Sequence, residues 1–252
     1  MKKHIIFIWI IFAVMVAIRV FIPRSDYWEV LQVVAVILSI IIFVKCKLPS
    51  RKYIFISILL AVLVDVSYIG AARNPWVLLY GMISAVPTLL SSLAVFSVME
   101  KHGGYEFISH KGKHPVIKSI VIALLVTVVL LGICFLISNN EKHFSFSAWK
   151  LMICLNPGIF EEMAGRAIFM SYFMCFSKDK MNLFECFTMY FMMAMPHAMV
   201  HGKGLIETGM LFLMFGLTFS ILQKKRDILT PMLSHGLYDA VMFMFVGLPV
   251  SV

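Results

Sequence analysis

The chain alternates between long apolar runs and short polar segments. Nine runs have the length of a membrane span: 5–22, 28–45, 53–72, 76–99, 116–137, 149–175, 183–201, 205–222 and 228–249. A helix needs roughly 20 mostly apolar residues to cross a bilayer. Because backbone groups in hydrocarbon must be paired within the protein, each run is expected to be helical. The pattern predicts an all-α transmembrane bundle of about eight or nine spans, eight if 205–222 does not cross the membrane.

Composition supports the same class of protein. The chain is 61% hydrophobic and only 14% charged, whereas soluble domains are typically ~45–50% apolar and ~25% charged. The net charge of +9 would suggest a nucleic-acid partner in a soluble protein, but here it is assigned to short loops. Residues 1–22 resemble a signal peptide, yet no small-residue cleavage pattern follows them, so we expect a retained first span.

The loop charges predict the orientation of the bundle. With the N terminus in the cytoplasm, the inner segments hold most of the 22 Lys and Arg residues: Lys2, Lys3, Lys45, Lys47, Arg51, Lys52, Lys101, Lys111, Lys113, Lys118, Lys178, Lys180, Lys224, Lys225 and Arg226. The outer segments hold Arg24, Arg73, Lys142, Lys150 and Lys203. Positive charge concentrates on the cytoplasmic side of membrane proteins. We therefore expect a plasma-membrane protein with its N terminus in the cytoplasm. If all nine spans cross the membrane, its C terminus lies on the outer side.

The five cysteines show no CxxC motif and no metal-ligand spacing. They are Cys46, Cys134, Cys154, Cys175 and Cys186, all in or beside apolar runs. Inert thiols, rather than disulfides, are therefore expected.

Ionisable residues inside the spans are rare and concentrate late in the chain. They are Asp65, Glu161, Glu162, Arg166, His197, His201, His235 and Asp239. Such residues are functional candidates because charge in hydrocarbon is costly. The distribution predicts a catalytic core in residues 116–252, within the last four spans, and a scaffold or substrate enclosure in residues 1–115.

The sixth span carries two carboxylates and a guanidinium. Glu162 and Arg166 are four residues apart, so they share a helix face and can pair. Glu161 lies about 100° away around the helix, without the arginine. The spacing assigns Glu162 and Arg166 to structural support and leaves Glu161 available as a general base. A purely structural Glu–Glu–Arg cluster remains the alternative.

Two later spans carry histidine pairs with the same spacing. His197 and His201 are four residues apart, as are His235 and Asp239. A single histidine in a span is usually a packed core residue, but two such pairs and the glutamates favour a shared polar cavity. His201 lies beside Gly202 and Lys203 and is interpreted as a boundary residue. Prolines precede the cluster at Pro157, Pro196 and Pro231, where they free backbone groups or simply kink the helix.

These residues carry a family resemblance. "EEMAGR" fits an EExxxR motif, "MAMPH" fits FxxxH with methionine in place of the aromatic residue, and "HGLYD" fits HxxxN/D. Glu161 to His197 spans 36 residues and His197 to His235 spans 38. Over residues 150–245 the chain resembles the CAAX protease and bacteriocin-processing (CPBP or Abi) family of intramembrane glutamic endopeptidases.

The resemblance implies roles for the site residues. Glu161 would activate water, His197 would position it, and His235 with the residue at 239 would stabilise the oxyanion. Asp239 departs from the asparagine that would donate a hydrogen bond, because an ionised carboxylate only accepts; it would orient His235 or donate when protonated. The resemblance favours a metal-free site without cofactors. A divalent metal such as zinc, held by Glu161, His197, His235 and Asp239, is the alternative.

Depth along the helices tests the shared cavity. Counted from the cytoplasmic ends, Glu161 and His197 lie roughly 20 Å deep and His235 roughly 10 Å deep, at 1.5 Å per residue. Helix tilt has to close this difference if the three side chains meet.

The leading functional hypothesis is an endopeptidase that cleaves a membrane-associated peptide or protein. By analogy, peptide-pheromone maturation or bacteriocin processing and immunity fit this small chain better than prenyl-protein processing. A transporter or channel with a Glu–His–Asp proton or cation relay is the second hypothesis, and a non-catalytic membrane immunity protein is the third.

Overall fold

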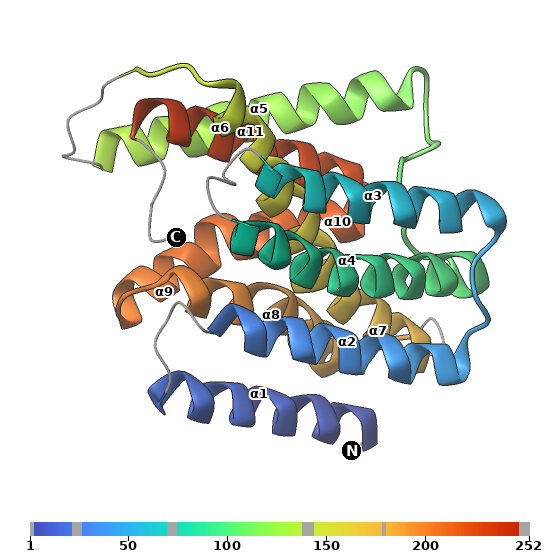
Figure 1. The fold of residues 1–252 in the computed structure, drawn as a ribbon. Coiled ribbons are helices and arrows are strands. Elements are labelled where there is room, and N and C mark those ends of the chain that lie inside the picture. Colours follow the sequence, from blue (N-terminus) through green and yellow to red (C-terminus); the bar gives the residue numbers. More distant parts are fainter. Residues whose placement is uncertain (1–2, 22–26, 70–74, 138–143, 178–179, 247–252) are drawn as a thin grey trace.

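A computed structural model describes residues 3–21, 27–69, 75–137, 144–177 and 180–246, and within these ranges it is helical with no strands (Figure 1). The elements are α1 (Lys3–Phe21), α2 (Tyr27–Lys45), α3 (Arg51–Ile69), α4 (Pro75–His102), α5 (Pro115–Ile137), α6 (Ala148–Ile153), η2 (Pro157–Glu161), η3 (Met163–Ala167), α7 (Ile168–Ser177), α8 (Leu183–His201), α9 (Leu205–Leu211), η4 (Phe212–Leu217), α10 (Thr218–Lys225) and α11 (Leu229–Phe245). The predicted helical membrane bundle is confirmed.

Within the described residues, each of the nine predicted spans is occupied by helical segments. Among the described residues, six helices are long and apolar enough to cross a membrane: Lys3–Phe21, Tyr27–Lys45, Gly81–His102, Pro115–Leu136, Leu183–His201 and Leu205–Lys225. The other three differ for visible reasons. α3 contains Arg51, Lys52 and Asp65, the segment from α6 to α7 is interrupted, and α11 has only 17 residues.

The interruption before α7 consists of π-helical turns. η2 and η3 follow one another with only Glu162 between them, and Pro157 opens η2. Proline lacks the amide hydrogen that an α-helix would use there, so the irregular turn begins where the sequence removes a donor. Such π-helical turns often occur at functional sites; here they carry Glu161 and Arg166, and Glu162 lies between them.

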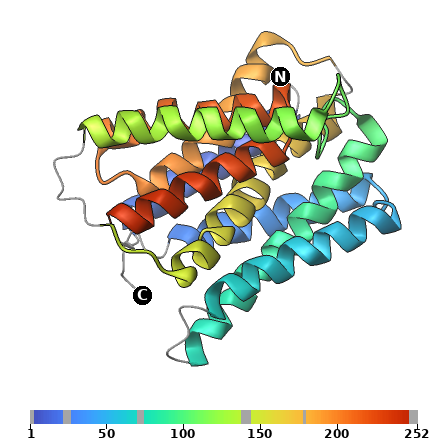
Figure 2. The same cartoon turned by 90° about the horizontal axis from the view of Figure 1, so that it is seen from above.

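The segment containing these turns is the centre of the bundle. Every residue from 157 to 174 is buried, and α2, α4, α8, α10 and α11 pack around it. Figure 2 shows this segment crossing at an angle to α5 and α11, which run side by side. α1 and α5 instead present exposed apolar side chains outward, including Ile10, Val14, Leu125 and Val128. These faces suit contact with lipid.

Glycine permits the closest approach between the centre and α11. A Cβ atom added to Gly158 would lie 2.9 Å from the backbone oxygen of Met232 and 3.2 Å from the Cα and N of Gly236. Small residues allow membrane helices to pack backbone against backbone. This contact fixes α11 against η2, beside Glu161.

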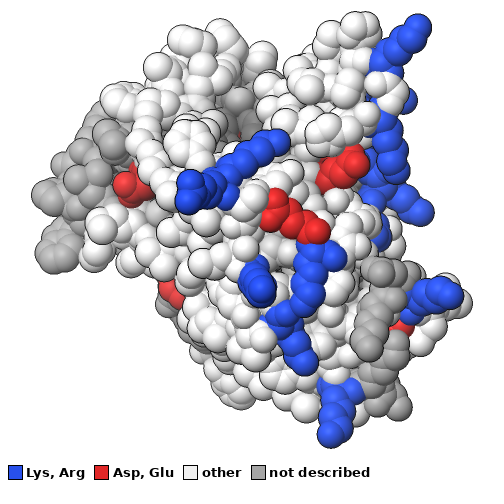
Figure 3. All heavy atoms as spheres, turned by 90° about the vertical axis from the view of Figure 1, so that its right-hand side faces the viewer, with Lys and Arg blue, Asp and Glu red and all other residues white. Residues whose placement is uncertain are grey.

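One end of the bundle is strongly basic. Figure 3 views this end, where Lys and Arg side chains gather. This end is formed by the C-terminal ends of α2, α4 and α10 and the N-terminal ends of α3 and α5. Its basic residues include Lys45, Arg51, Lys101, Lys118, Lys224 and Lys225. We call this surface the basic end.

Candidate active site

Glu162 is the most heavily bonded carboxylate of the site. Its Oε1 accepts a hydrogen bond from Arg166, in the contact that the i, i+4 spacing predicts, and lies 2.7 Å from Nδ1 of His235. Gln223 on α10 donates from Nε2 to Glu162 Oε2 at 2.8 Å and to the Glu162 carbonyl oxygen at 3.1 Å. Glu162 therefore holds together η3, α10 and α11.

Arg166 is fully buried and is held from two sides. Its guanidinium pairs with Glu162 and lies over the ring of Phe219, 5.3 Å from the ring centroid. A buried cation needs such partners because desolvation of an unpaired charge is costly. The arrangement gives Arg166 a structural place in the site, bound to the Glu162 carboxylate and the Phe219 ring.

Glu161 faces three histidines from two helices. Its Oε2 lies 3.3 Å from Nδ1 of His197 and 3.6 Å from Nε2 of both His201 and His235. Among the described residues, neither Glu161 Oε2 nor His197 Nδ1 has a hydrogen-bond partner, although both atoms are buried. Buried polar atoms of this kind call for an explanation, and their convergence marks a place where a reacting molecule can be held.

His235 lies among three carboxylates, those of Glu161, Glu162 and Asp239. Its Nδ1 faces Glu162, while its Nε2 lies 3.6 Å from Glu161 and 3.5 Å from Oδ2 of Asp239. His235 and Glu161 are therefore in contact, although counting residues along the helices puts them at different depths. They meet because the segment bearing Glu161 crosses α11 at an angle (Figure 2), so depth along one helix does not equal depth along the other.

The N-terminal half contributes an aromatic wall. Trp28 on α2 lies with its ring centroid 5.9 Å from that of His197, 5.4 Å from His201 and 5.9 Å from Phe160. Residue 28 thus restricts the positions of two histidines from outside the predicted catalytic core.

Part of the site has a donor set suitable for a metal ion. One carboxylate oxygen of Glu161 and one nitrogen each of His197 and His201 lie within 4.8 Å of one another. Two histidines and a glutamate are the protein ligands of some catalytic zinc sites. These three residues therefore fit a divalent cation. This ligand set differs from the predicted one, because it contains His201 and lacks His235 and Asp239.

Residues 143–241 match the family described as type II CAAX prenyl endopeptidase, Rce1-like. Over this region, which is less than half of the chain, the sequence is similar to the CAAX protease family. The match contains all the predicted site residues from Glu161 to Asp239, and it leaves α1 to α5 outside. No curated protein and no solved structure matches the chain.

Three residues of the candidate site were not assigned to it from the sequence. His201 was interpreted as a boundary residue; its side chain is 43% exposed but still reaches Glu161, as its spacing from His197 allowed. Gln223 and Trp28 have no local motif that links them to the glutamates, because they come from other helices.

Proposed function

We propose that this protein is an intramembrane endopeptidase in which Glu161 activates water to hydrolyse a peptide bond. The observation that carries the proposal is the unequal environment of the two glutamates. Arg166, Gln223 and His235 occupy Glu162, whereas Oε2 of Glu161 faces histidine nitrogens 3.3–3.6 Å away without a hydrogen bond. A general base has to keep such an atom accessible to the proton that it removes.

In the proposed reaction, Glu161 takes a proton from a water molecule while the water oxygen bonds to the carbonyl carbon. His197, whose Nδ1 lies 3.3 Å from Glu161 Oε2, holds that water in line with the carbonyl. The tetrahedral intermediate then collapses, the carbon–nitrogen bond breaks, and Glu161 gives its proton to the leaving nitrogen. Water is consumed and the carboxylate is regenerated.

His235 is proposed to stabilise the oxyanion of that intermediate. With its Nδ1–H donating to Glu162, a protonated His235 also donates from Nε2, the atom that faces Glu161 and Asp239. The negative charge of Asp239 favours that protonated ring. An asparagine at this position would donate a hydrogen bond to the oxyanion directly, whereas Asp239 would act through His235. Stabilisation of the developing oxyanion charge often contributes more to the catalysis of acyl transfer than any other effect.

The proposed substrate is a membrane-associated peptide or protein. An apolar cavity of about 930 Å³ is lined by residues of α5, α9, η4 and α11, including Leu205, Met210, Phe215 and Met242. Phe215 also packs against Tyr238, next to Asp239, with ring centroids 4.8 Å apart. We propose that this cavity receives an apolar part of the substrate. We also propose that residues 1–115 help to enclose the substrate.

We further propose the role and orientation expected from the sequence. Maturation of a peptide pheromone or processing of a bacteriocin would supply substrates of this kind. The basic end seen in Figure 3 supports a plasma-membrane protein with its N terminus in the cytoplasm, since basic loops favour that side.

A metal-dependent hydrolase is the second candidate, and the cluster of Glu161, His197 and His201 favours it. In that form the three side chains would hold a divalent cation, which would supply an activated water. We prefer the metal-free form, in which Glu161 itself takes the proton.

The experiment compares purified protein in liposomes with Glu161→Gln, His235→Ala and the control Glu29→Gln. Glu29 is an exposed carboxylate on α2. The probes are a farnesylated peptide with a CAAX terminus and an unmodified amphipathic peptide, with cleavage read by mass spectrometry. We expect Glu161→Gln to lose about 10²–10⁴-fold in rate and the control to keep its rate.

Chelation separates the two candidate mechanisms. Activity that survives a chelator but not Glu161→Gln supports the metal-free endopeptidase. If a chelator abolished cleavage and added Zn²⁺ restored it, the metal-dependent mechanism would be supported instead. Full cleavage by Glu161→Gln would refute both, and the probe that is cleaved distinguishes prenylated from unmodified substrates.

A further inference from the structure

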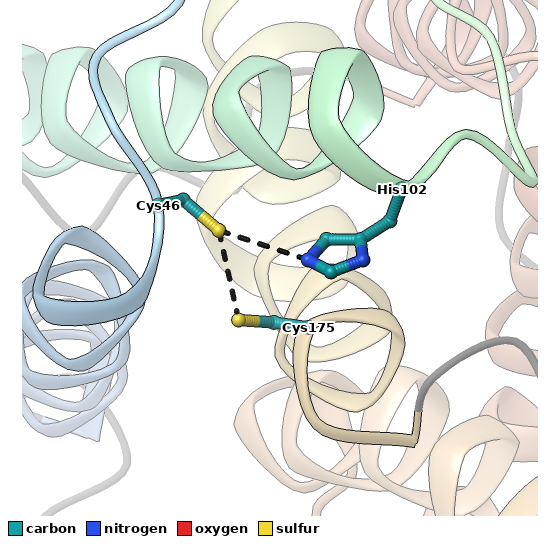
Figure 4. A group of neighbouring side chains, drawn as sticks. All are labelled: Cys46, His102 and Cys175. Atoms are coloured by element: carbon teal, nitrogen blue, oxygen red, sulfur yellow. Dashed lines mark hydrogen bonds between the residues drawn. The ribbon is translucent and has the colours of Figure 1, made fainter.

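A second cluster of ligand-type side chains lies far from the peptidase site. Cys46 Sγ is 3.7 Å from Cys175 Sγ and 4.0 Å from Nε2 of His102 (Figure 4). All three ligand atoms lie within 4.8 Å of one another. Along the sequence these residues show no metal spacing, because they come from the ends of α2 and α4 and from α7. We call them the Cys–His–Cys cluster.

The distances suit tetrahedral coordination. Two zinc–sulfur bonds of about 2.3 Å at the tetrahedral angle place the sulfur atoms about 3.8 Å apart, and a zinc–nitrogen bond of about 2.0–2.1 Å places nitrogen about 3.6 Å from sulfur. The Cys46–Cys175 separation of 3.7 Å matches the first value. The His102 contact of 4.0 Å needs an adjustment of about 0.4 Å, which a side-chain rotation supplies.

The surrounding backbone fixes two of the ligands. Cys46 continues the last turn of α2 through a hydrogen bond from its N–H to the Ile42 oxygen at 2.8 Å. Lys101 donates from Nζ to the Lys45 oxygen at 2.6 Å, which joins the residues immediately before His102 and Cys46. The two helix ends are thus held together before any ion binds.

Burial and position also fit an ion site that is accessible to water. Cys46 is buried, whereas His102 and Cys175 are partly exposed at the basic end. Cys175 lies 14 residues after Glu161 along the central segment, about 20 Å at 1.5 Å per residue. Its donor set is therefore separate from the glutamate and histidines of the peptidase site.

We propose that Cys46, His102 and Cys175 form a binding site for one thiophilic metal ion of the Zn²⁺ type. Thiolate and imidazole ligands select zinc and similar ions over Mg²⁺ or Ca²⁺. Binding converts the two thiols to thiolates and releases two protons, so that two negative charges balance the divalent cation. The bound ion fastens α2 and α4 to α7 at the basic end, and water completes the fourth position.

The test uses the full-length protein in detergent with a non-thiol reductant. Co²⁺ and Cd²⁺ serve as probes, because thiolate ligands give both ions charge-transfer absorption bands that carboxylates and histidines alone do not. We expect one ion per chain with such a band. Cys46→Ser and Cys175→Ser should each weaken binding by more than about tenfold, since even outer partners of ligands contribute 10–100-fold.

Two controls keep the test independent of the peptidase site and of folding. Cys186→Ser, which changes a partly buried thiol of α8, should keep the band, as should Glu161→Gln. In the unmodified protein, Zn²⁺ should protect Cys46 and Cys175 from alkylation and leave Cys186 reactive. Absence of the band, its retention in both cluster variants, or unprotected thiols would overturn the proposal. The proposal would also be overturned if the reduced protein did not bind Co²⁺ and the same protein formed a Cys46–Cys175 disulfide once the reductant was replaced by a chemical oxidant.

Discussion

Gly158→Ala tests whether the approach of α11 to η2 sets the geometry of the site. The added Cβ would lie 2.9 Å from the Met232 oxygen and 3.2 Å from Gly236 Cα and N. These are backbone atoms, so no side-chain rotation can relieve the contact. Because His235 lies between Met232 and Gly236 on α11, a displacement of that helix moves its imidazole away from Glu161.

The expected loss of stability and of rate in Gly158→Ala follows from the steric overlap of the added Cβ with α11. Ordinary contacts begin near 3.4 Å, so α11 has to shift by roughly 0.5 Å at the closest point. Overpacking of this kind costs about 1–3 kcal/mol of stability. Since a misplacement of about 1 Å can cost about 10²-fold in rate, a shift of half that size should lower kcat about tenfold.

The assay measures peptide cleavage in liposomes at a temperature where thermal unfolding shows the variant to be folded. Gly132→Ala is the matched control, because nothing lies within 4 Å of the Cβ added at that α5 glycine. We expect the control to keep its rate. A Gly158→Ala protein with full kcat, or a control equally impaired, would refute the view that this contact positions His235.

Three further substitutions probe the glutamates. Arg166→Met leaves Glu162 as a buried charge without its cation, and should lower the free energy of unfolding by about 3–5 kcal/mol; unchanged thermal stability in detergent would contradict the ion pair. Gln223→Met removes the donor 2.8 Å from Glu162 Oε2 and should cost about 1–3 kcal/mol, measured in the same way. His201→Ala should lower cleavage by less than the roughly 10²-fold typical of a lost acid or base; complete loss would instead favour the metal-dependent form.

Hydropathy was sufficient to place the helices because the bilayer leaves few alternatives for the backbone. The run predicted at 28–45 is observed as Tyr27–Lys45, and 183–201 is observed with the same bounds. α4 extends to His102, three residues beyond the predicted end, because a helix can continue into the polar boundary. What hydropathy did not indicate was the pair of π-helical turns, for which Pro157 was the only local signal.

Local spacing and long-range packing account for different parts of the site. The Glu162–Arg166 contact followed from i, i+4 geometry, which depends on one helix alone. Gln223 and Trp28 approach from helices whose relative positions no local pattern determines. The same reason explains why Cys46 and Cys175, 129 residues apart, gave no metal signal. Sequence patterns therefore identified side chains on one helix better than partners across helices.

The buried network around Glu162 is better explained by orientation than by stability. A buried ion pair often contributes little net stability, because desolvation offsets the attraction between the charges. Yet Glu162 receives contacts from η3, α10 and α11, which fixes the backbone turn at residue 162 from three directions. Glu161 is the residue immediately before it, so the same contacts aim its carboxylate toward His197. On this reasoning, a change that frees Glu162 should disturb catalysis even where Glu161 itself is intact.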